Sequence, residues 1–159
     1  MGCGNAEFSE EMYDDGVKQI YNIDISSVVI AQMKKRNAAR NLMTYEEMDV
    51  RKLDYEDEFF DVAIDKSTID ALLCGDDAFL NVALMMEQVQ RVLKPGGVYM
   101  AISYGRPENR IFHFERPNLD FAIKQLVLYP ADCATEEEKE EKSHFVYLCT
   151  KGPNAKKNH

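Results

Sequence analysis

Four groups of residues in this chain are of types that could bind a ligand containing a nucleoside. In chain order they are Gly2-Cys3-Gly4, Asp24, Asp49 and the pair Asp65-Lys66. Glycines at a first turn let the backbone approach a ligand closely, and the helix that follows begins with free N–H groups. A carboxylate about 20 residues later, here Asp24, can accept hydrogen bonds from two ribose hydroxyls. A further carboxylate, Asp49, can accept one from an adenine amino group.

Each of these residues also has an ordinary structural interpretation. A single Gly-x-Gly can simply mark a turn, and Asp49 can be a turn residue. Asp24 can cap a helix that starts near Ser26, and Asp65 can cap the segment 68–73. The order and spacing of the four groups favour the joint interpretation, because all lie at predicted strand ends, where open α/β sheets bind ligands.

The elements that must position these residues alternate between helix and strand. Helical spacing, a Ser26 or Ser27 cap and stops at Gly16 and Pro95 predict helices over residues 6–15, 28–40 and 78–93. Apolar alternation or continuous apolar runs predict strands over residues 17–24, 44–48, 59–65, 98–103, 121–129 and 144–150. This order predicts an α/β fold with an open, mostly parallel sheet. The charge run at 136–142 is typical of a solvated loop or helical turn.

Length and composition predict one soluble globular domain over residues 1–152, followed by a polar tail over 153–159. The net charge of −9 makes the 159-residue chain a poor match for nucleic acid and a better one for a basic, lysine-bearing protein surface. We expect no membrane partner, since no apolar run approaches the ~18 residues of a span and no secretion signal precedes the domain. Scattered cysteines predict reduced thiols, no metal and a cytoplasmic location: Cys3, Cys74, Cys133 and Cys149.

Five segments of the chain carry a family pattern: residues 2–5, 22–29, 48–53, 60–72 and 91–97. They include the motifs D-I-S-S-V-V, M-D-V-R-K-L-D and D-K-S-T-I-D-A-L. Together they resemble the class I S-adenosylmethionine-dependent methyltransferases. The combination of the three motifs is specific for the methyltransferase-like family that includes lysine methyltransferases of translation elongation factor one-alpha. The resemblance is strong over residues 1–103 and extends to 104–150.

This resemblance implies a Rossmann-like fold with an antiparallel hairpin at the carboxy-terminal edge of the sheet. It implies S-adenosylmethionine as cofactor and a protein with an exposed lysine as substrate, elongation factor one-alpha being the leading candidate. The implied cofactor contacts are Gly2 and Gly4 beside the methionine part, Asp24 on the ribose, Ile25 on the adenine ring, Asp49 on its amino group, and Val50 beside the ring.

At the fourth strand of the family, the resemblance assigns Asp65 and Lys66 to the cofactor site. It also places Asp65, Ser67 and Thr68 on the substrate side. Human-type relatives have Glu and Gly where this chain has Asp65 and Ser67, so the resemblance does not fix the substrate contacts there. No covalent nucleophile is required and no catalytic residue is named, but one hypothesis is that Asp65 orients the lysine amine.

The chain departs from the family pattern at its start. Family members have an apolar central strand immediately before the glycine turn, and Met1 stands where its last residue belongs. We therefore expect this chain alone to bind the cofactor weakly or not at all. The explanations are a start lying upstream, a strand supplied by another chain, or a non-catalytic relative. A methyltransferase-like binding module without turnover and a small-molecule methyltransferase remain the alternative functions.

Overall fold

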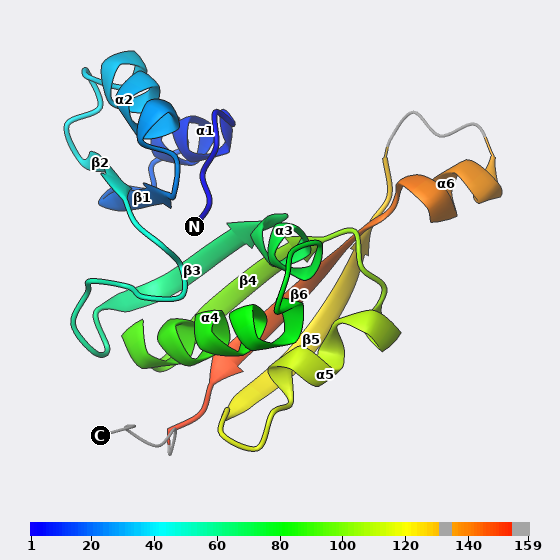
Figure 1. Ribbon diagram of the computed structural model, residues 1–159. Helices are drawn as coiled ribbons and strands as arrows, with labels where there is room; N and C mark the ends of the chain where they lie inside the picture. The colour runs from blue at the N-terminus through cyan, green and yellow to red at the C-terminus, as the bar shows by residue number, and fades with distance from the viewer. Residues whose placement is uncertain (131–134, 154–159) are drawn as a thin grey trace. The chain divides into compact units, whose positions relative to one another are not determined.

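The computed structural model describes residues 1–130 and 135–153 (Figure 1). Cys133 and most of the expected polar tail lie outside these described residues. Contacts within the chain divide it into two compact units, Met1–Asp54 and Tyr55–His159. The relative placement of the two units is not determined, and the expectation of a single domain stays a prediction.

The first unit contains two helices and one pair of parallel strands. Its elements are α1 (Phe8–Asp14), β1 (Ile20–Asp24), α2 (Ser27–Arg36) and β2 (Met43–Glu47). Strands β1 and β2 pair in parallel, in a register that runs from Ile20↔Met43 to Asp24↔Glu47. One apolar cluster joins α2 to β2 and also takes in side chains of α1 and β1; its buried members are Ile30, Met33, Met43 and Tyr45. The β1–β2 pair is therefore held to its helices by a common core.

Local chemistry sets the ends of these elements. Ser26 is the N-cap of α2, because its hydroxyl accepts a hydrogen bond from the Val29 N–H at 3.4 Å. The helix ends at Arg36, four residues before the predicted end at residue 40. Its C-cap, Asn37, is buried, and the Asn37 side-chain amide donates to the Met33 carbonyl and to the Glu10 carboxylate. Strand β1 begins at Ile20 rather than at residue 17, because Gln19 has a left-handed backbone with φ 60°.

The second unit is a four-stranded mixed sheet with the strand order β3-β4-β6-β5. Strands β3 (Phe60–Lys66) and β4 (Leu93–Ser103) are parallel, and β6 (His144–Lys151) is antiparallel to both β4 and β5 (Phe121–Leu128). The expected antiparallel hairpin at the carboxy-terminal edge is therefore confirmed. The helical elements of the unit are α3 (Thr68–Leu73), α4 (Ala78–Val92), η1 (Pro107–Asn109), α5 (Ile111–Phe114) and α6 (Glu136–Lys142).

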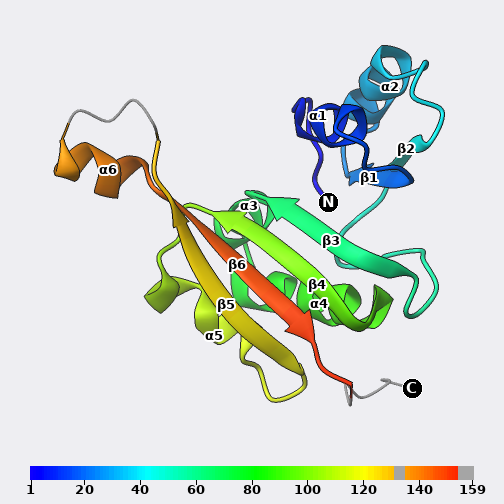
Figure 2. The same ribbon diagram turned by 180° about the vertical axis from the view of Figure 1, so that it is seen from behind.

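Helices α3, α4 and α5 cover one face of this sheet, and the view from behind shows the strands in front of them (Figure 2). Side chains alternate between the two faces of β4: Tyr99, Ala101 and Ser103 are buried, and the residues between them are only partly buried. One face of the strand therefore belongs to the core. Helix α4 supplies the largest helical contribution to the core with Val82, Met85, Met86, Val89, Gln90 and Val92. None of the helices within residues 1–130 and 135–153 is long and apolar enough to cross a membrane.

A prediction concerns the turn between β3 and α3. Ser67 has φ 66°, in the left-handed region that is unfavourable for a residue with a β-carbon. Its side chain makes no cap hydrogen bond that would offset this steric penalty. Replacing Ser67 with Gly should raise the free energy of unfolding by about 0.5–1 kcal/mol, because glycine adopts this conformation without a steric penalty. Ser67→Ala, which keeps the β-carbon, is the control and should show no gain. Urea unfolding of the three proteins measures this, and a glycine variant no more stable than the alanine variant would contradict it.

Candidate cofactor site

The glycine turn and Asp24 meet at the carboxyl end of β1. The Gly4 N–H donates to Asp24 Oδ2 at 2.9 Å, although 20 residues separate them in sequence. The neighbouring Cys3 N–H donates to the Ile23 carbonyl at 2.9 Å, which holds the turn against the strand. Two of the residues expected to form a cofactor site are therefore brought together by direct contact.

Gly4 has φ 51°, a backbone conformation that residues with a β-carbon rarely adopt. A β-carbon added at Gly4 would meet no atom within 4 Å. The glycine is thus required by the turn and not by crowding from the protein, and open space remains beside its backbone. This is the arrangement that the close approach of a ligand to the turn needs.

Asp24 organises the end of β1 through both oxygens of its carboxylate. Oδ2 accepts from Gly4, and Oδ1 accepts from the Ser26 N–H at 2.9 Å. The capping interpretation of Asp24 is not what the structure shows, because Ser26 itself caps α2. A carboxylate oxygen has more than one lone-pair site, so these backbone contacts leave the half-buried Asp24 able to accept further hydrogen bonds. The next side chain, Ile25, is 68% exposed and offers an apolar surface at the same strand end.

Asp49 follows β2 and is engaged by a residue that the sequence interpretation missed. Arg51 contacts its carboxylate with the backbone N–H at 2.8 Å, with Nε at 2.9 Å and with Nη2 at 2.6 Å. Hydrogen bonding from the Arg51 side chain holds the Asp49 pKa below its ordinary value. The Met48 N–H donates to the Asp24 carbonyl at 3.0 Å, which ties this segment to the end of β1. Val50 is 7% exposed, so its side chain is largely part of the core of the unit.

The Cys3 thiol between the two glycines is not poised as a nucleophile. Burial, and next the nearby charge of Asp24, raise the pKa of Cys3 to about 11. The thiol is therefore protonated at neutral pH, and the thiolate is the reactive form of cysteine. The turn holds the backbone in place and supplies no covalent chemistry.

The remaining two predicted residues, Asp65 and Lys66, lie in the second unit at the end of β3. Asp65 is completely buried, and its carboxylate accepts from the Thr68 N–H at 2.6 Å, the Ile69 N–H at 3.0 Å and the Tyr99 hydroxyl at 3.0 Å. These contacts match the capping interpretation of Asp65, since two of the donors belong to the first turn of α3. Burial raises the Asp65 pKa above its ordinary value despite these donors. Its assignment to the cofactor site, like that of the exposed Lys66, stays a prediction.

Comparison with known proteins identifies the family. Residues 1–101 match the family of methyltransferase domains. The chain belongs to this methyltransferase family. Its relatives include the human eEF1A lysine and N-terminal methyltransferase, 36% identical over 157 residues, which cover 95% of this chain and 22% of that protein. A second is the mouse EEF1A lysine methyltransferase 4, 33% identical over 132 residues, with 78% of this chain and 52% of that protein covered. The methyltransferase chain thus spans about a fifth of the first of these relatives and half of the second.

Solved structures support the same fold. A SAM-dependent methyltransferase from Methanosarcina mazei superposes with a TM-score of 0.72 at 17% identity, over 95% of this chain and 90% of that one. The N-methyltransferase NodS from Bradyrhizobium japonicum, solved in complex with S-adenosylhomocysteine, has a TM-score of 0.70 at 15% identity, over 96% and 76%. The methyltransferase chain therefore has the Rossmann-like fold of the S-adenosylmethionine-dependent enzymes.

S-adenosylmethionine is the cofactor of this family, and the first unit offers groups that fit it. The open backbone at Gly4, the spare acceptor capacity of Asp24 and the exposed Ile25 lie at one strand end. Over residues 1–130 and 135–153, no three His, Cys, Asp or Glu side chains are grouped as they would be around a metal ion.

The first site prediction concerns Asp24. Asp24→Asn removes the negative charge and directs an N–H donor toward a backbone N–H, so it should weaken S-adenosylhomocysteine binding at least tenfold, or about 1.4 kcal/mol. Calorimetry measures the dissociation constant of each protein, and the ratio of the two constants is the expected effect. Asp54→Asn, an exposed carboxylate of the same unit, is the matched control and should bind as the wild type does. Equal affinities of the Asp24 variant and this control would remove Asp24 from the site.

The second prediction is that ionisation of Asp65 makes the stability of the protein depend on pH. The pKa of Asp65 in the folded protein lies above 3.8, the ordinary value of an aspartate, so folding favours the protonated carboxyl. This contribution is present below pH 3.8 and is lost as the pH rises through the folded pKa. The stability of the wild type relative to Asp65→Asn, which cannot ionise, should therefore fall from pH 3.8 toward neutrality. Denaturant unfolding across this range measures the difference, and a constant difference would exclude a raised pKa.

Proposed function

We propose that this protein is an S-adenosylmethionine-dependent methyltransferase that transfers a methyl group to a lysine side chain of a protein. The leading candidate for the acceptor is translation elongation factor 1A. The observation that carries the transferase proposal is the contact between Gly4 and Asp24 at the end of β1, in a chain of this family. The choice of acceptor rests on relatives named for lysine methylation of eEF1A.

Methyl transfer requires the protein to align the methyl donor with the acceptor and to exclude water from the site. S-adenosylmethionine supplies a methyl group already activated on a positively charged sulfonium. In this proposal Gly4 and the Asp24 carboxylate fix the nucleoside end of the cofactor, with Ile25 against its adenine ring and Asp49 at its amino group. The residual task is to bring a neutral amine into line with the methyl group, which is an effect of orientation and desolvation.

The negative charge of the chain supports a basic acceptor, although some of its carboxylates form ion pairs within the chain. Residues 46–61 carry eight carboxylates, a run that could dock a basic surface. Three of them are paired in the fold: Asp49 with Arg51 at 2.6 Å, Asp57 with Arg91 at 2.9 Å, and Asp61 with Lys94 at 2.7 Å. This run is therefore a weaker docking surface than its sequence suggests. The net charge of −9 still favours a basic protein over a polyanion.

Two other functions make different predictions. A methyltransferase-like binding module would bind S-adenosylhomocysteine or a protein without turnover. A small-molecule methyltransferase would turn over metabolites and leave proteins unmodified. We include a cytoplasmic location in the proposal, since the acceptor and the scattered cysteines both suit that compartment.

Transfer of a labelled methyl group tests the function. The wild type and Asp24→Asn are each incubated with labelled S-adenosylmethionine and, separately, with purified elongation factor 1A, a lysate protein fraction and a lysate metabolite fraction. We expect the label on lysine of elongation factor 1A, with at least a tenfold lower rate for the variant. Label in the metabolite fraction alone would favour the small-molecule enzyme. Absence of label from all three, with cofactor bound, would favour the binding module.

A further inference from the structure

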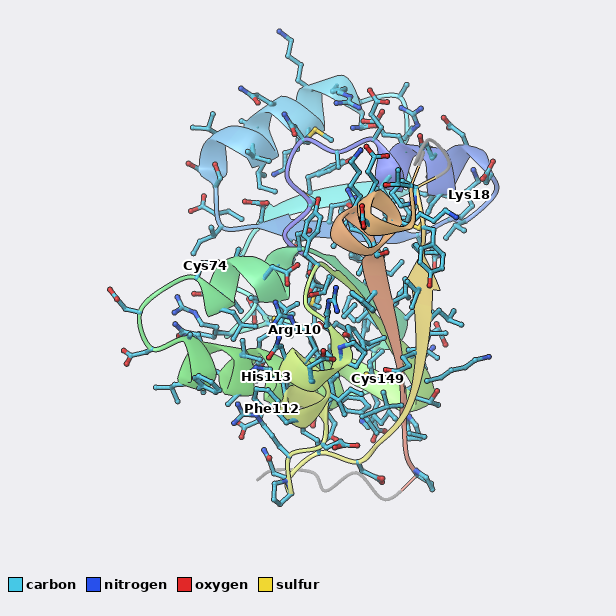
Figure 3. The ribbon with its side chains drawn as sticks, turned by 90° about the vertical axis from the view of Figure 1, so that its right-hand side faces the viewer. Lys18, Cys74, Arg110, Phe112, His113 and Cys149 are labelled. Carbon is cyan, nitrogen blue, oxygen red and sulfur yellow. The ribbon has the colours of Figure 1, made fainter. Side chains whose placement is uncertain are left out.

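Strand β5 is an outer strand of the second unit and has one free edge. In the strand order β3-β4-β6-β5 it lies at the end of the sheet, and within the described residues it pairs with β6 alone. Figure 3 shows the two strands side by side, with Cys149 of β6 labelled; across the pair, this residue is the partner of Ile123 of β5. The outward backbone N–H and C=O groups of β5 are therefore available to pair with a further strand.

Consecutive large apolar side chains are exposed at the end of this strand and directly after it. All residues from 124 to 129 are exposed. The apolar ones, between 39% and 61% exposed, are Leu126, Val127, Leu128 and Tyr129. Because successive side chains of a strand point to opposite faces, both faces of the edge are apolar here. Single exposed apolar residues are common on proteins, but a consecutive run on a free strand edge is a site for pairing with another strand.

The features that usually protect an edge strand are few along β5. Natural edge strands carry charges, proline or a β-bulge, each of which prevents pairing with a second edge. The pairing of β5 with β6 continues without a bulge over all 8 residues of β5. Lys124 is the single charged residue from 121 to 129, and Pro130 comes after the apolar run. The edge is therefore open to pairing where it is apolar.

The order of residues on this edge is complementary to itself. When two identical strands pair antiparallel about a twofold axis, the residue on the axis faces its own copy, and side chains that face each other lie on the same face of the sheet. An axis at Val127 gives three pairs on each side: Leu126 with Leu128, Gln125 with Tyr129, and Lys124 with Pro130. The exposed apolar residues of the strand then face one another, and no lysine faces a lysine. An axis at any other residue would pair at least one of these apolar residues elsewhere.

Charge also favours contact between two copies at this edge. The net charge of −9 opposes self-association over most of the surface, but residues 121–130 contain no carboxylate. With the axis at Val127, Lys124 of one copy lies beside the end of β5 of the other, from which the chain continues toward α6. Because α6 has the sequence EEEKEEK, the charge of the edge is attracted by the other copy.

We propose that residues 125–129 form a self-association surface, on which a second copy of this chain adds its own β5 antiparallel to the first, about a twofold axis at Val127. The sheet β3-β4-β6-β5 then continues into the same four strands of the other copy in reverse order. Because twofold pairing uses both free β5 edges at once, the assembly closes at two copies. The inference goes beyond the proposed function, concerns the second unit alone and does not depend on cofactor binding.

Sedimentation velocity of the full chain over a range of concentrations tests the inference. We expect a dimer with a dissociation constant of about 10 μM, since one short strand edge buries less surface than a standard interface. Val127→Lys and Val127→Glu each place like charges opposite each other at the axis, so each should raise this constant at least tenfold. An equimolar mixture of the two variants places opposite charges at the axis and should bring the constant back to within about threefold of the wild type.

Leu84→Lys is the matched control. Leu84 of α4 has the same exposed fraction as Val127, 39%, but lies outside the proposed surface, so this variant should dimerise as the wild type does. A wild type that stays monomeric up to about 200 μM would overturn the inference. Val127→Lys with the wild-type dissociation constant, or a mixture of folded variants that does not regain the dimer, would overturn it as well.

A cysteine cross-link tests the axis with a smaller change to the strand. Residues that face each other in an antiparallel pair have α-carbons about 4.5–5.5 Å apart, within the range of a disulfide. Val127→Cys should therefore link two copies through residue 127 in oxidised glutathione, as mass spectrometry of the linked peptides would show. Leu84→Cys should give no link through residue 84. A dimeric Val127→Cys protein without the link would place the interface elsewhere and overturn the inference.

Discussion

The organisation of the first unit depends on one hydrogen bond, from the Gly4 N–H to the Asp24 carboxylate at 2.9 Å. It joins a turn at the start of the chain to the end of β1, and the second carboxylate oxygen directs the chain into α2 through Ser26. The apolar cluster of Ile30, Met33, Met43 and Tyr45 then fixes α2 on the strand pair. The acceptor groups of Asp24 are thereby set before any ligand binds, which is the condition for strong electrostatic recognition.

Asp24 is the last residue of β1 and Asp65 is the last but one of β3, but the two aspartates have different surroundings. Asp24 is half-buried, and its carboxylate accepts hydrogen bonds from the backbone N–H groups of Gly4 in the turn and of Ser26. Asp65 is fully buried and its carboxylate meets Thr68, Ile69 and the Tyr99 hydroxyl. Burial therefore distinguishes the two aspartates: Asp24 keeps a partly accessible carboxylate, and the carboxylate of Asp65 caps the start of α3. The Tyr99 contact comes from a strand 34 residues away, which no local pattern around Asp65 reveals.

The sequence predicted what depends on local chemistry. The strand–helix order, the Ser26 cap and the glycine turn follow from short-range signals, whereas the carboxy-terminal hairpin follows from the family resemblance, and the structure confirms them. The ends of the elements were predicted less accurately. Helix α2 ends at Arg36, because the buried side chain of the next residue, Asn37, hydrogen-bonds to Glu10 of α1, a contact distant in sequence. The pairing of Arg51 with Asp49 was missed although the two residues are only two positions apart, since a sequence does not show which rotamer an arginine adopts. The hydrogen bonds of Ser103 and Gly105, at the end of β4, were missed because they join residues up to 42 positions apart.

The protonation states in the described part of the chain suit a reaction that needs no nucleophile from the protein. Burial raises the pKa of Cys3 to about 11 and that of Cys149 to about 12, so both thiols stay protonated at neutral pH. Burial, and next the charges of Arg116 and Arg110, lower the pKa of His113 to about 4, which keeps that imidazole neutral. Its ring is 1% exposed and packs against Phe79 and Phe112, out of reach of a substrate. Methyl transfer from a sulfonium requires alignment and desolvation of donor and acceptor, and it needs no ionised thiol or imidazole from the protein.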